Sequence, residues 1–279
     1  MEARFKSFSS GSCGNCYFLG LFDDDGTCEA GVVIDAGVSM RRIKRELALE
    51  GLGMDDFSAI LVTHDHMDHI RSLGSWCKHL AKPVYATETL HRALSRHTMC
   101  CEYIGGCRKV MGDEWVDIVP GLIKARWFEV PHDATQTVGY AVLLGDHKYV
   151  HITDCGRITA EAMGWLKQAD TVVIESNYDP YMLEHGPYPR ELQVRISNGH
   201  GHMANCECAA AIREFAHEGL RNIFLCHLSE HNNTPELAMQ ESRAALDPLG
   251  LSVKCPNGAE RGIRLCPLPR QTPSQMFVL

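Results

Sequence analysis

The sequence predicts an α/β protein in which two β-sheets are covered by helices. Short apolar runs rich in Val, Ile, Tyr and Phe recur along the chain, each of strand length and bounded by Gly, Asp, Pro or Asn. Helical patterns lie between several of these runs. Because the runs are apolar on both faces, they need cover on both sides, which two stacked sheets with outer helices would provide.

The predicted elements follow one another along the chain. The predicted strands span residues 16–22, 30–35, 58–64, 124–130, 138–144, 148–153, 171–176, 222–228 and, more weakly, 262–266. The predicted helices span residues 40–52, 77–82, 87–97, 159–168, 205–219 and 234–246. The last helix begins with Thr234-Pro235, a favourable pair for the N-cap and the first helical position.

Length and composition favour one globular domain. An α/β protein of 279 residues often forms a single unit, so we expect one domain over residues 1–267. Residues 268–279 contain prolines and are expected to form a C-terminal tail.

Composition also bears on location and on partners. No apolar stretch approaches the roughly 18 residues of a membrane span, and the first residues lack the apolar run of a signal peptide, so a cytoplasmic protein without membrane contact is expected. The 13 cysteines, an odd number, suit reduced thiols in that compartment. The net charge of -8 argues against a broad basic surface for nucleic acid, although bound divalent cations would change the local field.

Histidine and aspartate residues gather at the end of the strand predicted over 58–64. The motif is His64-Asp65-His66-Met67-Asp68-His69. Imidazole and carboxylate groups together suit Zn²⁺ and similar ions, and such groups left unpaired beside a buried strand would be costly. A polar loop of solvated histidines is the alternative. It is disfavoured because more of these residues follow other predicted strands, namely Asp35, His132, Asp154 and His227.

This order of residues resembles the hallmark of the metallo-β-lactamase superfamily, a His-x-His-x-Asp-His loop followed by distant His, Asp and His. The resemblance covers residues 5–233 and implies a four-layer αββα sandwich, with two mixed β-sheets flanked by helices and a site at one edge. The implied ligands of a first metal are His64, His66 and His132. Those of a second metal are Asp68, His69 and His227. Asp154 would bridge both metals, and Asp35 would orient a ligand histidine from outside.

A finer resemblance is to the WalJ (YycJ) type of this superfamily. The segments that carry it are SFSSGSCGNCYFLG (7–20), VPHDATQTVGYAV (130–142), ITDCG (152–156), ESNYDPYML (175–183), GPYPRELQVRI (186–196), GHMAN (201–205) and HLSEHNN (227–233). That family is linked to 5′-to-3′ exonuclease activity on double-stranded DNA, so a DNA substrate is implied. Two positions depart from the family pattern: Tyr178 stands where His is common and Ala204 where Ser is common, and both are expected at the substrate edge.

The resemblance implies phosphodiester hydrolysis by a hydroxide that two divalent ions generate from water. Asp68 or Asp154 would accept the proton of that water. His202 is the candidate for a phosphate contact or for the acid that protonates the leaving group. The alternative for His202 is a loop histidine bonded to the backbone.

Further substrate contacts are expected from two regions. Ser12 and Asn15 lie in a loop of small residues that can reach a phosphate or the metal loop, and the alternative is a tight hairpin turn. Arg190 and Arg195 lie near the GHMAN segment and are candidates for clamping a DNA backbone. Asn205, the last residue of that segment, is expected to be a further contact.

Several alternatives stay open. The same fold also hydrolyses RNA, small phosphodiesters and thioesters, so the fold alone does not determine the substrate. A non-catalytic member of the fold is disfavoured because every metal position is filled. The His and Asp ligands favour Zn²⁺ or Mn²⁺ and also admit Fe²⁺. The oligomeric state is left open.

Overall fold

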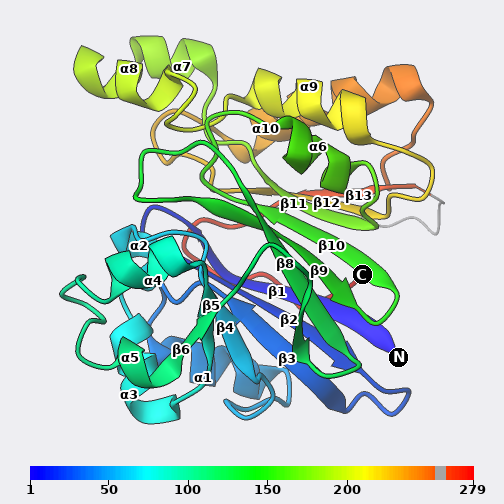
Figure 1. Cartoon of the computed structure of the whole chain (residues 1–279). Coiled ribbons are helices and arrows are strands. Elements are labelled where there is room, and N and C mark those ends of the chain that lie inside the picture. The colour runs from blue at the N-terminus through cyan, green and yellow to red at the C-terminus, as the bar shows by residue number, and fades with distance from the viewer. Residues whose placement is uncertain (255–261) are drawn as a thin grey trace.

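Two seven-stranded β-sheets stack face to face at the centre of the computed structural model, which describes residues 1–254 and 262–279 (Figure 1). The first sheet has the strand order β14-β1-β2-β3-β4-β5-β6, and the second has the order β13-β12-β11-β10-β9-β8-β7. Each sheet is antiparallel on one side and parallel on the other. The predicted pair of mixed sheets is therefore confirmed.

The predicted apolar runs form strands, and five further strands of the described residues lie outside the predicted set, the longest of which spans Glu2–Gly11. The strands of the first sheet are β1 Glu2–Gly11, β2 Gly14–Phe22, β3 Cys28–Ile34, β4 Ala59–Leu61, β5 Val84–Ala86, β6 Arg108–Val110 and β14 Phe277–Val278. The strands of the second sheet are β7 Val116–Val119, β8 Ile123–Glu129, β9 Val138–Leu144, β10 His147–Ile152, β11 Thr171–Glu175, β12 Asn222–Cys226 and β13 Arg264–Pro267. β2, β11 and β12 are buried along their whole length, as expected of strands covered on both faces.

Helices form the outer layers on both sides of the stacked sheets (Figure 1). Those on the side of the first sheet are α1 Met40–Leu49, α2 Met67–Ile70, α3 Leu73–Leu80, α4 Glu88–Leu94 and α5 Ile104–Cys107. Those over the second sheet are α6 Ala160–Leu166, α9 Asn205–Phe215 and α10 Pro235–Leu246, which continues into the 3₁₀ turn η1 Asp247–Leu249. The layer order is thus the predicted αββα sandwich. As expected, the Thr234 hydroxyl caps α10 by accepting a hydrogen bond from the Leu237 amide at 3.2 Å.

Helices α7 Pro180–His185 and α8 Arg190–Ser197 stand at one end of the molecule, beside the α9 layer (Figure 1). They lie outside the predicted set, as do the four-residue helices α2 and α5. The start of α7 is nevertheless defined locally. Asp179 caps α7 by accepting from the Met182 amide at 2.8 Å, with Pro180 at the first helical position.

The two sheets meet in an aromatic core. Phe5 of the first sheet and Phe224 of the second have ring centroids 4.9 Å apart, and Tyr149 packs against Phe5 at 5.9 Å. A second apolar cluster fills the space between the second sheet and helices α6, α9 and α10. All cysteines of the described residues are free thiols. None of the described helices combines the length and the apolar character that crossing a bilayer requires.

The C-terminal residues 268–279 pack onto the first sheet instead of forming the expected tail. Strand β14 pairs antiparallel with β1, with Phe277 opposite Phe5. Upstream, the Arg270 carbonyl accepts hydrogen bonds from the Ser10 amide and the Ser9 hydroxyl. The physical reason is that the open edge of β1 offers unpaired backbone groups and the buried Phe277 ring fills a gap beside Phe224.

Replacing Phe277 by alanine is expected to lower the free energy of unfolding by about 3 kcal/mol, because it removes buried apolar surface and leaves a cavity. Urea-induced unfolding measures this change. Val278→Ala is the matched control. Val278 lies on the same strand but is 46% exposed, so this substitution is expected to lower the free energy of unfolding by less than about 0.5 kcal/mol. Equal losses in the two variants would contradict the docking of this strand.

Candidate metal centre

The candidate metal centre lies where strands from both sheets end. In the first sheet, Asp35 follows β3 and His64 comes shortly after β4. In the second sheet, Asp154 follows β10, Glu175 ends β11 and His227 follows β12. β3 and β4 are parallel, as are β10, β11 and β12, so the carboxyl ends of each set meet at one edge. Topology thus gathers residues that are far apart in the sequence.

Three of these strand-end residues adopt the left-handed backbone conformation. The φ angles are 60° at Asp35, 46° at Asp154 and 52° at His227. Such a conformation costs a non-glycine residue of order 1–3 kcal/mol and persists only where its surroundings hold it. The Asp35 amide donates to the Leu61 carbonyl at 2.8 Å, and the His227 amide donates to the Ser10 hydroxyl at 3.0 Å. The chain is therefore turned sharply at the points where site side chains leave it.

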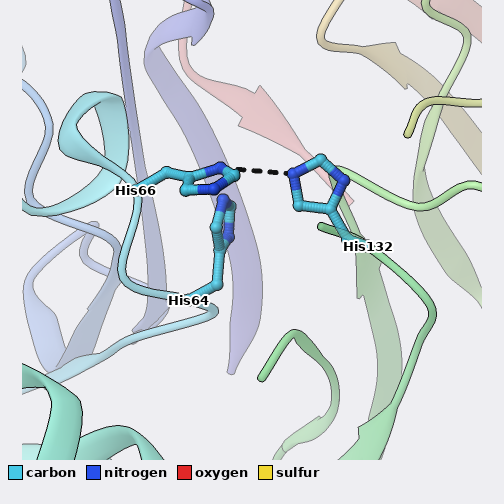
Figure 2. Close-up of side chains that lie close together, drawn as sticks. All are labelled: His64, His66 and His132. Atoms are coloured by element: carbon cyan, nitrogen blue, oxygen red, sulfur yellow. Dashed lines mark hydrogen bonds between the residues drawn. The ribbon is translucent and has the colours of Figure 1, made fainter. Parts of the chain in front are cut away.

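His64, His66 and His132 form the first group of potential ligands (Figure 2). His66 Nδ1 lies 3.3 Å from His132 Nε2, and the ring of His64 lies 4.7 Å from that of His66. His132 Nδ1 donates to the Gly201 carbonyl at 2.6 Å. In a neutral imidazole this bond leaves the Nε2 lone pair directed to the group.

Asp68, His69 and His227 form the second group, with Asp154 between it and the first. The Nε2 atoms of His69 and His227 each lie 3.5 Å from Asp68 Oδ2. Asp154 Oδ2 is 3.1 Å from His69 Nε2, and Asp154 Oδ1 is 3.9 Å from His132 Nε2. Asp154 thus reaches both groups.

Asp35 contacts the centre through His69 and through Thr63, whose hydroxyl lies 3.1 Å from His64 Nδ1. Its carboxylate accepts hydrogen bonds from His69 Nδ1 at 2.7 Å and from the amide and hydroxyl of Thr63, each at 2.8 Å. With Nδ1 donating to Asp35, His69 presents Nε2 to the centre.

Glu175 is a site residue that the sequence reasoning missed. It is fully buried, and its Oε1 accepts from His202 Nδ1 at 2.8 Å and lies 3.1 Å from His227 Nδ1. Its Oε2 accepts from the amides of Cys155 at 2.8 Å and Met203 at 3.1 Å. The available signal was its position as an acidic residue at the end of a predicted buried strand.

The donor groups fit divalent cations. Ligand atoms within each group lie within 4.8 Å of one another. His64 Nε2 and His227 Nε2 are buried and have no hydrogen-bond partner among the described residues, an arrangement that a bound cation would relieve. Burial lowers the pKa of His64 well below its usual value, which keeps the imidazole neutral with one nitrogen lone pair available. Burial opposes protonation of His227, but nearby carboxylates, foremost Asp154, raise its pKa to about 10. These carboxylates therefore create a region that attracts cations.

Comparisons with known proteins agree with this geometry. Residues 31–227 match the family profile described as a beta-lactamase superfamily domain. The chain belongs to the metallo-β-lactamase superfamily. Exodeoxyribonuclease YycJ of Bacillus anthracis is 32% identical over 259 residues, covering 91% of this chain and 92% of that protein. Exodeoxyribonuclease WalJ of Streptococcus pneumoniae is 31% identical over 247 residues, covering 84% of this chain and 85% of that protein.

A solved structure shares the superfamily fold over nearly the full length. The metallo-beta-lactamase fold protein YhfI from Bacillus subtilis aligns with a TM-score of 0.66 and 13% identity, covering 98% of this chain and 99% of that chain. The resemblance to the metallo-β-lactamase superfamily and its WalJ (YycJ) type is therefore confirmed, and the chain is a metal-dependent hydrolase. Its fold implies divalent metal ions at the His and Asp groups described above.

In this metallo-β-lactamase domain, a cavity of about 220 Å³ opens over the ligand groups. Ser12, Arg195 and His202, which the sequence places at the substrate, line it. Arg195 Nε donates to the carboxylate of Asp133, which also lines the cavity. His202 Nδ1 is engaged by Glu175, so Nε2 is the ring atom left for a substrate. The alternative for His202 was a ring bonded to the backbone. Its ring bonds instead to the Glu175 carboxylate.

The other expected substrate contacts lie elsewhere. Asn15 is fully buried, with Nδ2 3.1 Å from Asp68 Oδ2 and 2.9 Å from His69 Nε2, so it reaches the metal loop rather than the cavity. Asn205 is buried behind the site, where it accepts from Ser176 and donates to Asn233. Arg190 is exposed and bonds to Gln193, outside the described residues that line the cavity. The contact of Asn15 with the metal loop is one of the two that the sequence analysis expected, whereas Arg190 and Asn205 do not line the cavity because proximity in the sequence does not specify which way a side chain faces.

The two departures from the family pattern lie beside each other. Tyr178 and Ala204 pair through an isolated parallel β-bridge and are 5% and 3% exposed. Both belong to a small apolar cluster with Leu183 and Ile196. Neither is among the described residues that line the cavity, so they pack behind its wall rather than at the expected substrate edge.

Asp35→Asn is expected to weaken metal binding about 10- to 100-fold, because the charge that holds the proton on His69 Nδ1 is lost. Competition with a chromophoric chelator measures the affinity. Asp56→Asn is the matched control, since Asp56 Oδ2 accepts from the Gly53 amide at 2.6 Å in a distant turn and no loss of affinity is expected. An unchanged affinity in Asp35→Asn would refute this role of Asp35.

Proposed function

We propose that this hydrolase is a binuclear metal-dependent phosphodiesterase, a 5′-to-3′ exonuclease that acts on double-stranded DNA. The observation that carries the proposal is the position of Asp154, which lies between His69 at 3.1 Å and His132 at 3.9 Å. A carboxylate placed between two ligand groups suits a two-metal site, and two-metal sites are typical of enzymes that cleave phosphodiesters. Zn²⁺ and Mn²⁺ are the preferred ions, and Fe²⁺ is also compatible with this ligand set.

The choice of substrate is supported by the relatives. YycJ and WalJ are both named exodeoxyribonucleases, and each aligns over most of its length with this chain. The alignment spans the segments that hold all seven potential ligands. The free thiols of the described cysteines are compatible with a reducing cytoplasm, where DNA would be available.

The side chains at the centre have distinct tasks in the proposed reaction. When bound, divalent ions supply water activated for attack and neutralise charge that grows on the phosphoryl oxygens. Asp68 and Asp154 offer carboxylate oxygens that can accept the proton of the attacking water. His202 Nε2 faces the same cavity and can contact the phosphate or give a proton to the leaving oxygen.

Glu175 supports the role of His202. Burial alone would lower the pKa of His202, but the carboxylates of Glu175 and Asp154 raise it above its usual value. The bond from Nδ1 to Glu175 also holds the ring in one orientation. Glu175 is therefore proposed as a positioning residue for His202 and for His227.

Chelation of divalent ions is expected to abolish cleavage of duplex DNA, and addition of Zn²⁺ or Mn²⁺ is expected to restore cleavage.

Asp68→Ala is expected to lower kcat/KM by roughly 100-fold or more, since it removes both a ligand and a proton acceptor. Asp65→Ala is the matched control in the same loop, because Asp65 bonds to Thr135 and not to the centre. Duplex DNA labelled at either end, RNA, a small phosphodiester and a thioester form the substrate panel. Equal DNA cleavage by wild type and Asp68→Ala, or selective cleavage of another substrate, would reject the proposal.

Arg195→Ala is expected to weaken DNA binding several-fold and to reduce the slope of log K against log salt by about one, because one phosphate contact is lost. Arg190→Ala on the same helix is the control, since Arg190 lies outside the cavity lining and no change is expected. Fluorescence anisotropy at several salt concentrations measures both variants. Identical salt slopes in Arg195→Ala and Arg190→Ala would contradict a phosphate contact at Arg195.

A further inference from the structure

One wall of the cavity is apolar, although its floor is made of His and Asp side chains. Tyr188, Leu192 and Ile196 form this wall. Leu192 and Ile196 are one turn apart on α8 and therefore share a face of that helix. Arg195 lies on the same side and also lines the cavity. Neither a metal ion nor a phosphate needs an apolar wall, so this surface points to another part of a substrate.

The position of Tyr188 is fixed by its neighbours. Pro187 and Pro189 flank it and restrict the backbone on both sides. The side-chain amide of the buried Gln193 donates to the Tyr188 carbonyl at 3.0 Å. The Tyr188 ring meets that of His231 edge to face, with centroids 5.9 Å apart and an interplanar angle of 78°. A ring held in this way loses little conformational freedom when it binds a ligand.

The wall rests on its own small cluster. Tyr188 and Leu192 pack against the buried side chains of Tyr178, Leu183 and Ile196. This cluster is separate from the two larger apolar clusters around the sheets. The wall is therefore a built surface at the cavity and not an exposed part of the main core.

We propose that Tyr188, Leu192 and Ile196 form a nucleobase subsite, where the base of the terminal nucleotide stacks on Tyr188 while its phosphodiester lies over the metal ligands. The inference rests on the proposed nuclease function and names how that site recognises its substrate. A nucleobase is the apolar, planar part of a nucleotide, and aromatic side chains bind all bases by stacking with little sequence preference. Arg195, beside the wall, supplies the positive charge that an adjacent phosphate requires.

The subsite has a consequence for duplex ends. A terminal base that stacks on Tyr188 must first leave its own stack and its partner, which costs less at a mismatched or frayed end. The enzyme is therefore expected to cleave a duplex with a mismatched terminal pair faster than a fully matched one. Base identity at the terminus is expected to matter little.

The test compares, with metal-loaded protein, duplexes that end in a normal nucleotide or in an abasic tetrahydrofuran residue. Wild type is expected to prefer the normal end by roughly ten-fold or more in kcat/KM. Tyr188→Ala is expected to lose this preference and Tyr188→Phe to keep it. Tyr181→Ala is the matched control, because Tyr181 is a 70% exposed tyrosine on α7 that stacks on His185 outside the cavity lining. For each variant, the ratio of kcat/KM between the normal and the abasic end is measured on one preparation. A misfolded fraction of the protein lowers both values equally and therefore does not change the ratio.

A binding measurement separates this inference from the proposed function. Calorimetry compares deoxyadenosine monophosphate with deoxyribose 5-phosphate, and wild type is expected to bind the nucleotide more tightly than Tyr188→Ala does. If no DNA end is cleaved, the nuclease proposal fails, while the calorimetry still decides on the subsite. Equal affinity of wild type for the two ligands, or a base preference that survives in Tyr188→Ala, would overturn it.

Discussion

The carboxylate of Asp154 is almost fully buried between imidazoles that come from both sheets, 3.1 Å from His69 and 3.5 Å from His227. A carboxylate in a low-dielectric interior is stable only beside opposite charge or hydrogen-bond donors, so these groups depend on one another and on cations. The stacking of the sheets makes this possible, because the first sheet supplies His69 and the second supplies Asp154 and His227. The catalytic chemistry of the molecule follows from this one junction.

Each sheet supports its own ligands with one further carboxylate. In the first sheet Asp35 holds His69, and in the second Glu175 holds His202 and His227. Both acids are fully buried and also accept bonds from backbone amides, which limits their movement. These bonds restrict the orientations of the potential ligand side chains, and such restriction lowers the cost of binding an ion.

The two sheets and the α7–α8 pair contribute differently to the cavity. Residues at the strand ends form the polar floor, and the register of the strands sets the positions of these side chains. Helix α8 and the loop before it provide an apolar wall with Tyr188, held by a separate small cluster. Such a division leaves the chemistry on a rigid scaffold and places substrate recognition on a peripheral element.

The sequence by itself determined the class of fold and indicated most of the potential metal ligands. Apolar runs such as 171–176 predict buried strands through local composition, and the motif from His64 to His69 is contiguous, so both are visible without the fold. Only the tertiary structure decided that Glu175 meets His202 and His227 and that Phe277 docks beside Phe5. The physical reason is that periodicity and turn chemistry act between neighbours in the chain. The meeting of buried groups depends instead on strand register and on how the two sheets stack, which no short segment encodes.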